Sequence, residues 1–89
     1  MKVIESQATP NPNAIKLLLD GPITDRPQSF FNPDAARGHA LGEALFGIEG
    51  VASVLLLHDF VTINKSPAAA WKDVTPKVKK LLAGWKGGI

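Results

Sequence analysis

Residues 51–65 read VASVLLLHDFVTINK, and this stretch decides the fold. Two runs rich in β-branched and other apolar residues, Val51–Leu57 and Phe60–Lys65, stand on either side of His58 and Asp59. Runs of this kind, separated by two residues, are typical of antiparallel strands joined by a tight turn. The stretch therefore predicts a β-hairpin.

The register of this hairpin predicts a different role for each of its faces. Leu56 pairs with Val61 and Val54 pairs with Ile63, which makes one uniformly apolar face that we expect to lie under helices. The opposite face carries Leu55, Leu57, Phe60 and Thr62. If helices cover only one side of the sheet, water meets an apolar strip on the other side, and such strips often mark interaction surfaces.

The segment from Ile23 to Pro33 is compatible with two roles. Gln28 to Asn32 predicts a short strand around Phe30 and Phe31. The same two aromatic side chains could instead cover the open face of the hairpin.

Two further strands are predicted near the N-terminus, at Lys2 to Gln7 and at Ala14 to Leu19. The Thr9-Pro10-Asn11-Pro12-Asn13 stretch between them cannot continue a strand, because proline lacks an amide donor and asparagine favours turns. This turn is either a plain connection or a recognition loop, since recognition residues gather in loops on rigid sheets. In the second strand, alternation separates one face with Ile15, Leu17 and Leu19 from another with Lys16, Leu18 and Asp20.

Apolar residues at helical spacing predict two helical regions. The first begins at Asp34 or His39, ends at Gly50, and places on one face Leu41, Leu45 and Ile48. The second follows Ser66-Pro67 and carries an apolar stripe of Trp71, Val74, Val78, Leu81 and Leu82.

Pro76 predicts an interruption of this second region. With Thr75 as a cap and Pro76 at the first helical position, a short helix is followed by a longer one that ends at Gly84. Trp85 then either folds back onto the helix or stays exposed. The solvent side carries Lys72, Lys77, Lys79, Lys80 and Lys86, which form either a solvated face or a nucleic-acid site.

The order of these elements predicts an α+β fold, a mostly antiparallel sheet with two helices packed on one face. With 89 residues the chain can bury one hydrophobic core, so residues 1–89 are expected to form a single domain. The net charge of +2 is too small for a typical nucleic-acid binder and indicates an acidic partner only weakly.

The residue types present argue against catalysis and against a bound cofactor. The chain has no cysteine, which excludes disulfides, thiol nucleophiles and cysteine-ligated zinc or iron–sulfur clusters within it. His39 and His58 are too far apart in sequence to supply a ligand spacing. Asp59 fits the hairpin turn, where a short side chain can accept a backbone amide hydrogen bond. No catalytic triad or phosphate-binding loop is recognisable.

No stretch approaches the roughly 20 apolar residues of a membrane span, and Met1 to Gln7 has no apolar run suited to a signal sequence. We therefore expect a cytoplasmic protein.

Four blocks of the sequence match a known family in the same order. They are Thr9-Pro10-Asn11-Pro12-Asn13-Ala14 with Lys16 following, Leu45-Phe46-x-Ile48-x-Gly50-Val51, Asp59-Phe60-Val61-Thr62-Ile63-x-Lys65, and Trp71 ahead of Pro76. Together they resemble the N-terminal domain of Nfu-type iron–sulfur cluster scaffold proteins, over nearly the whole chain. The sequence departs from the family at His39 and Ala40, where a Ser-Pro pair usually begins the first helix, and between Ile23 and Asn32.

The resemblance implies a stand-alone accessory domain of iron–sulfur cluster assembly or delivery that acts by protein–protein interaction. In that family a Cys-x-x-Cys motif in a separate C-terminal domain holds the cluster, so the resemblance implies partner proteins that supply the cysteines: cluster carriers or recipients. The predicted partner-binding residues are Pro10, Asn11, Pro12, Asn13, Leu55, Leu57, Asp59 and Phe60. The alternative is a nucleic-acid-associated domain that uses the basic C-terminal helix.

Overall fold

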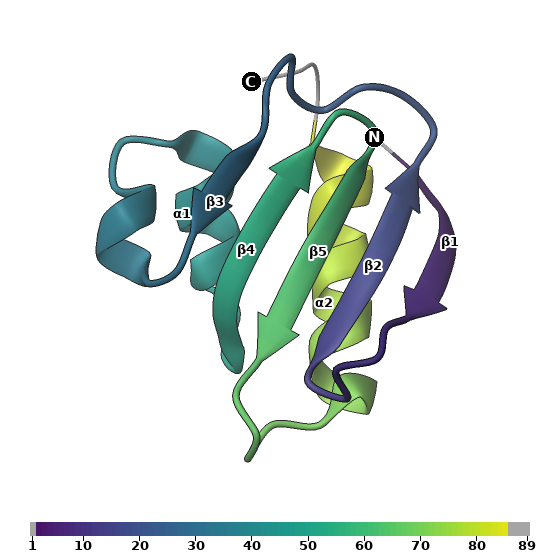
Figure 1. Cartoon of the computed structure of the whole chain (residues 1–89), viewed down its shortest axis with the longest axis vertical. Coiled ribbons are helices and arrows are strands. Elements are labelled where there is room, and N and C mark those ends of the chain that lie inside the picture. The colour runs from purple at the N-terminus through teal and green to yellow at the C-terminus, as the bar shows by residue number, and fades with distance from the viewer. Residues whose placement is uncertain (1, 86–89) are drawn as a thin grey trace.

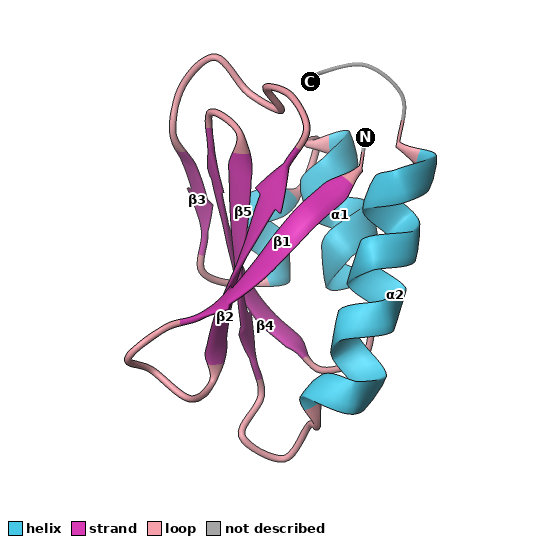
Figure 2. Ribbon diagram, turned by 90° about the vertical axis from the view of Figure 1, so that its right-hand side faces the viewer, coloured by secondary structure: helices cyan, strands magenta, loops and turns pink. Residues whose placement is uncertain are grey.

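Five strands form one antiparallel sheet in the computed structural model, which describes residues 2–85 (Figure 1). They follow the spatial order β1-β2-β5-β4-β3, with bounds Val3–Ala8 for β1, Ala14–Leu19 for β2, Gln28–Phe30 for β3, Val51–Leu57 for β4 and Phe60–Lys65 for β5. The helices lie on one side of this sheet (Figure 2). The predicted α+β architecture, with two α-helices on one face, is confirmed.

The β4–β5 hairpin has the register that its sequence predicts. Leu57 faces Phe60 across the two-residue turn, and Leu56 faces Val61 one position further from it. Both Leu56 and Val61 are completely buried, because this face of the hairpin lies under the helices. His58 in the turn has a positive φ of 21°.

The strand predicted around Phe30 and Phe31 exists as β3 but is shorter than expected and ends at Phe30. Phe30 is 7% exposed and enters the core, whereas Phe31 is 80% exposed. Successive side chains of a strand point to opposite sides, so two adjacent aromatic residues cannot both serve one face. β1 and β2 agree with prediction to within one residue at each end.

The first helical region is two short helices rather than one. A 3₁₀ helix, η1, spans Pro33–Ala36, and α1 spans Ala40–Phe46. Between them Gly38 has a φ of 88°, which interrupts the helical path. His39 Nδ1 accepts the N–H of Gly42 at 3.0 Å and so caps α1 as a serine hydroxyl would. A helix therefore still begins at this point, although the Ser-Pro pair of the family is absent.

The predicted end of the first helix at Gly50 is wrong, because α1 already stops at Phe46. Ile48 lies outside the helix but remains in the core. Gly50 has a φ of 97°, and a Cβ added there would lie 2.8 Å from Cβ of Ala69. At Gly50, directly before β4, the backbone therefore has a conformation and a close neighbour that only glycine accepts without strain.

The second helix, α2, is continuous over Trp71–Gly84, which corrects the break predicted at Pro76. A proline inside a helix costs about 3 kcal/mol through a lost hydrogen bond and a steric clash. The buried stripe continues on both sides of Pro76, and burying each of its large aliphatic side chains contributes about 1.5–3 kcal/mol. The free energy gained by packing the stripe therefore outweighs the cost of the proline. The fully buried members of the stripe are Val74, Val78 and Leu82.

Trp85, directly after α2, is half-buried and packs against the core, so the first of its two predicted positions is correct. Lys86 lies outside the described residues.

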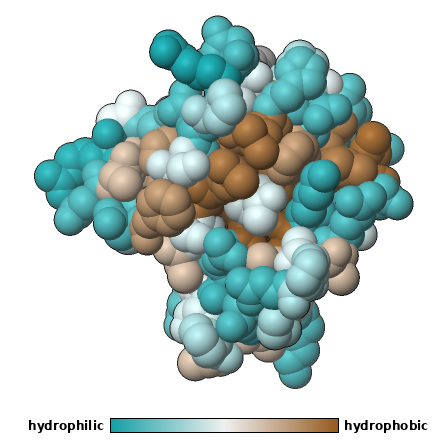
Figure 3. Space-filling model, in the orientation of Figure 1, coloured by the Kyte–Doolittle hydropathy of each residue, from teal (hydrophilic) through white to brown (hydrophobic). Residues whose placement is uncertain are grey.

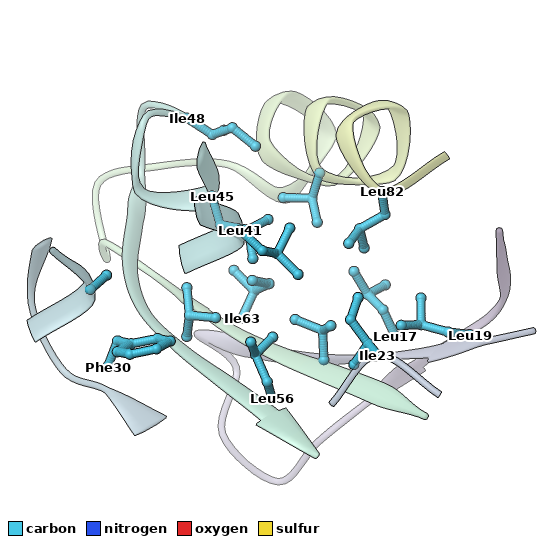
Figure 4. Packing of buried hydrophobic residues seen from close by; sticks show 14 of the residues in the cluster. Leu17, Leu19, Ile23, Phe30, Leu41, Leu45, Ile48, Leu56, Ile63 and Leu82 are labelled. Carbon is cyan, nitrogen blue, oxygen red and sulfur yellow. The ribbon is translucent and has the colours of Figure 1, made fainter. Parts of the chain in front are cut away.

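The core fills the space between the helices and one face of the sheet (Figure 4). Leu17 from β2 and Ile63 from β5 meet Leu41 and Leu45 from α1, and Leu82 from α2. All five side chains are completely buried. Within residues 2–85, neither helix has the length and apolar content needed to cross a bilayer.

Candidate functional site

The sheet face that points away from the helices carries an apolar row across three strands. Leu57, Phe60 and Leu18 are direct cross-strand neighbours on β4, β5 and β2, and each is half-buried. Leu55 lies two residues before Leu57 on the same face of β4. Figure 3 looks onto this side and shows a patch of apolar surface over these strands. We call Leu18, Leu55, Leu57 and Phe60 the open-face patch.

Phe30, in the segment before α1, does not cover the open-face patch. Phe30 points to the helix side and is buried there, while β3 extends the sheet beside β4. The β3 residue next to Leu55 on the open face is Ser29, which is small and polar. Because Phe30 is buried on the helix side, the interpretation in which Phe30 and Phe31 together shield this face is wrong.

Lys16 borders the patch and was not among the predicted binding residues. Its Nζ lies 4.1 Å from the centroid of the Phe60 ring, the geometry of a cation–π contact. Strand alternation already places Lys16 and Leu18 on one face of β2. Only the pairing of β2 with β5 places that face beside Phe60.

Asp59 has a different role from the one predicted for its side chain. Its carboxylate makes no hydrogen bond to residues 2–85, whereas its backbone carbonyl accepts the N–H of Leu19 at 2.8 Å. The His58 carbonyl likewise accepts the N–H of Ile23 at 2.6 Å. Main-chain hydrogen bonds from the last residue of β2 and from the segment after it hold this turn, so the exposed Asp59 carboxylate does not stabilise it.

The turn between β1 and β2 is held by its own polar side chains. The Thr9 hydroxyl accepts the N–H of Asn11 at 3.2 Å, and Asn11 Oδ1 accepts the N–H of Asn13 at 2.9 Å. Pro10 and Pro12 are exposed. These are the local bonds by which Thr and Asn stabilise turns.

The same turn is also fastened to the end of β5 and the start of α2. Asn13 Oδ1 accepts a hydrogen bond from Lys65 Nζ at 2.9 Å, and Trp71 Nε1 donates to the Pro12 carbonyl at 3.0 Å. Lys65 Nζ also lies 5.6 Å from the centroid of the Trp71 ring. We call Pro12, Asn13, Lys65 and Trp71 the clamp. It unites residues from three of the sequence blocks that carry the family resemblance.

The structure does not bring the predicted binding residues together on one surface. The Pro10–Asn13 turn precedes β2, and the hairpin turn at Asp59 contacts the end of β2. The six-residue length of β2 therefore separates them, by about 17 Å at the usual rise per residue. The β1–β2 turn and the β4–β5 turn lie at opposite ends of the sheet (Figure 1).

The two histidines do not converge with other possible metal ligands. His39 caps α1 and packs its ring against Phe30 at a centroid distance of 4.9 Å, while His58 is exposed in the hairpin turn. Across residues 2–85, no group of three His, Cys, Asp or Glu side chains could hold a metal ion.

Comparison with known families identifies one match, over residues 4–85, to the N-terminal region of the scaffold protein Nfu/NifU. A Drosophila willistoni protein named as a mitochondrial NFU1 iron–sulfur cluster scaffold homologue is 38% identical over 84% of this chain. The match covers 27% of that relative, so the chain spans about a quarter of the length of the curated relatives it matches.

Several solved structures share the fold. The crystal structure of the Staphylococcus aureus protein SAV1430 is 29% identical, with a TM-score of 0.77 over 92% of this chain and 99% of that protein. A NifU-like protein from Saccharomyces cerevisiae is 27% identical, with a TM-score of 0.73 over 88% of this chain and 72% of that one.

Proposed function

The chain belongs to the Nfu/NifU N-terminal family, and we propose that it is a non-catalytic accessory domain of iron–sulfur cluster assembly or delivery that docks a protein partner. The observation that carries the proposal is the open-face patch, an apolar row across β4, β5 and β2 that the helices leave to solvent. The relatives named as iron–sulfur cluster scaffolds support the cluster-related role.

The partner is a cluster carrier or a recipient protein. This chain contains no cysteine, so the thiolates that hold a cluster must belong to groups outside it. The domain would contribute binding and orientation, while the partner contributes the cluster ligands. A cytoplasmic location remains our expectation, although several curated relatives are named as mitochondrial.

The patch has the composition of a small docking site. Its centre is aromatic, at Phe60, and such anchors dominate binding energy in protein interfaces. Lys16 at its border offers a positive charge, and Asp59 near the hairpin turn offers an exposed negative one. Charges at the rim of an apolar centre favour one orientation of the partner over others.

The test is a binding titration against purified cluster-loaded carrier proteins that contain a Cys-x-x-Cys motif, with the variants Leu57→Gln and Phe60→Gln. Glutamine suits these half-buried positions better than a carboxylate, whose desolvation would itself destabilise the fold. Losing a central anchor costs about 2 kcal/mol or more, which is roughly a thirtyfold loss in affinity.

Glu49→Gln, at an exposed position between α1 and β4 that belongs to neither the open-face patch nor α2, is the control and should bind normally. Thermal melts establish that each variant is folded. Folded hairpin variants with unchanged affinity would place the partner elsewhere, with the Pro10–Asn13 turn as the next candidate surface. Absence of binding by the unaltered domain to every carrier would reject the proposed function itself.

A further inference from the structure

The outer surface of α2 carries a concentration of positive charge that no internal contact explains. Lys72, Lys77, Lys79 and Lys80 are all exposed, and together they form what we call the basic face. The only acidic residue of α2 is Asp73. Within residues 2–85, the single ion pair joins Arg37 to Asp34, so no lysine of the basic face is neutralised by a salt bridge.

The charges of the chain are segregated between α2 and the remainder of the described residues. α2 has four lysines against one acid, a local charge of +3. The rest of residues 2–85 has five basic and seven acidic side chains, a charge of −2. A helix whose surface charges serve only solvation usually mixes the two signs, often in pairs four residues apart. The small net charge of the chain thus conceals a strongly polarised surface.

The four lysines are close enough to act on one partner. The first and the last, Lys72 and Lys80, are eight positions apart, which is about 12 Å along a helix axis. Electrostatic screening at physiological ionic strength operates over about 8 Å, so the fields of neighbouring lysines add. Such a surface attracts an anionic partner and accelerates its association.

Two features of the basic face favour an acidic protein over a nucleic acid. It contains no arginine and no exposed aromatic side chain, the residues that bind phosphates in bidentate fashion or stack on bases. We propose that the basic face of α2 is a second docking surface, which takes an acidic surface of a partner protein.

The basic face and the open-face patch lie on opposite sides of the domain, separated by the sheet and the core (Figure 2). One partner can therefore occupy the basic face while another covers the open-face patch. With two such surfaces the domain can bridge two proteins. The basic face is inferred from charge and exposure alone and does not depend on the identity of the partner at the patch.

The test uses poly-L-glutamate as the acidic probe and compares two double variants with the same change in net charge. Lys79→Glu with Lys80→Glu reverses two charges on the basic face. Lys2→Glu with Arg26→Glu reverses two exposed charges elsewhere. Each reversal on the basic face removes an attraction and adds a repulsion, so we expect the first variant to bind about tenfold more weakly and the second to change by less than about threefold.

Equal weakening by both double variants would mean that the probe responds to net charge, and the proposal would fail. Unchanged binding by the Lys79→Glu, Lys80→Glu variant would also overturn it. If duplex DNA binds at about 0.15 M salt and poly-L-glutamate does not bind at the same salt concentration, the basic face is a nucleic-acid site and the proposal fails. A Phe60→Gln variant should bind the probe normally, since the open-face patch is on the other side.

Discussion

The hydrogen bond between Lys65 Nζ and Asn13 Oδ1 gives the most direct test of whether the β1–β2 turn is a structural device. Lys65→Met keeps an unbranched apolar side chain of similar length but removes the ammonium group, and with it the cation–π contact to the Trp71 ring. Asn13→Ala removes the acceptor and leaves the backbone carbonyl that accepts the N–H of Lys65 at 2.7 Å. The two changes therefore remove the same bond from either end.

The expected size of the effect follows from the exposure of the bond. Hydrogen bonds to charged groups contribute about 1.5–3 kcal/mol when buried. Lys65 and Asn13 are both only half-buried, and solvent screening reduces that figure to about 1 kcal/mol. Each single variant should lose at least that amount, which corresponds to about 4–8 °C in Tm for a domain of this size. The double variant should lose about 1 kcal/mol less than the sum of the two.

The assay is urea unfolding of the four proteins that make up the cycle, followed by tryptophan fluorescence and by circular dichroism. As a control, Lys72→Met is combined with Asn13→Ala, because Lys72 is exposed on α2 and makes no hydrogen bond to Asn13. That pair should be additive to within about 0.3–0.5 kcal/mol. A coupling energy below about 0.3 kcal/mol between Asn13 and Lys65 would refute the clamp and leave the side chain of Asn13 available for recognition.

Four further outcomes are expected. Val78→Asp should unfold the domain, because Val78 is 1% exposed and an unpaired buried charge costs several kcal/mol, while the exposed Lys79→Glu should change stability by less than about 0.5 kcal/mol in thermal melts. Pro76→Ala should stabilise by about 2 kcal/mol, the helix-interior penalty of about 3 less the entropy that proline removes from the unfolded chain; a loss of stability would contradict a continuous α2. Gly50→Ala should destabilise by at least about 1–2 kcal/mol in chemical unfolding, since its φ of 97° and the 2.8 Å approach to Ala69 both oppose a side chain. The purified protein should be colourless and free of stoichiometric iron and zinc by elemental analysis, even under reducing conditions; retained metal after dialysis would show a ligand set that the described residues do not reveal.

The hairpin was predictable because its information is local. Two apolar runs separated by His58 and Asp59 admit a tight turn, and a tight turn sets the pairing of Leu56 with Val61. The structure has this register, and its buried face is the one expected. The lysines of α2 were likewise placed correctly, because a period of 3.6 residues assigns every position of a helix to a face.

The predictions from sequence failed where long-range packing overrides a local conformational preference. Pro76 disfavours a continuous helix, yet the stripe on both sides of it packs against the sheet, and the burial outweighs the penalty. At Asp59, local rules favour a side chain that accepts a backbone hydrogen bond in the turn, and the prediction followed them. The last residue of β2 and the segment after it instead supply the main-chain donors to the turn.

By itself, the sequence determined which face of each strand is apolar, where the hairpin turns, which side of α2 is basic, and that this chain has no thiolate ligands. Only the tertiary structure decided that β2 lies beside β5, and hence that Leu18 and Lys16 complete the surface around Phe60. It also decided that Phe30 enters the core and leaves that surface open. The physical reason is that alternation along a strand depends only on backbone geometry, whereas the choice of neighbouring strands depends on the packing of the whole core at once.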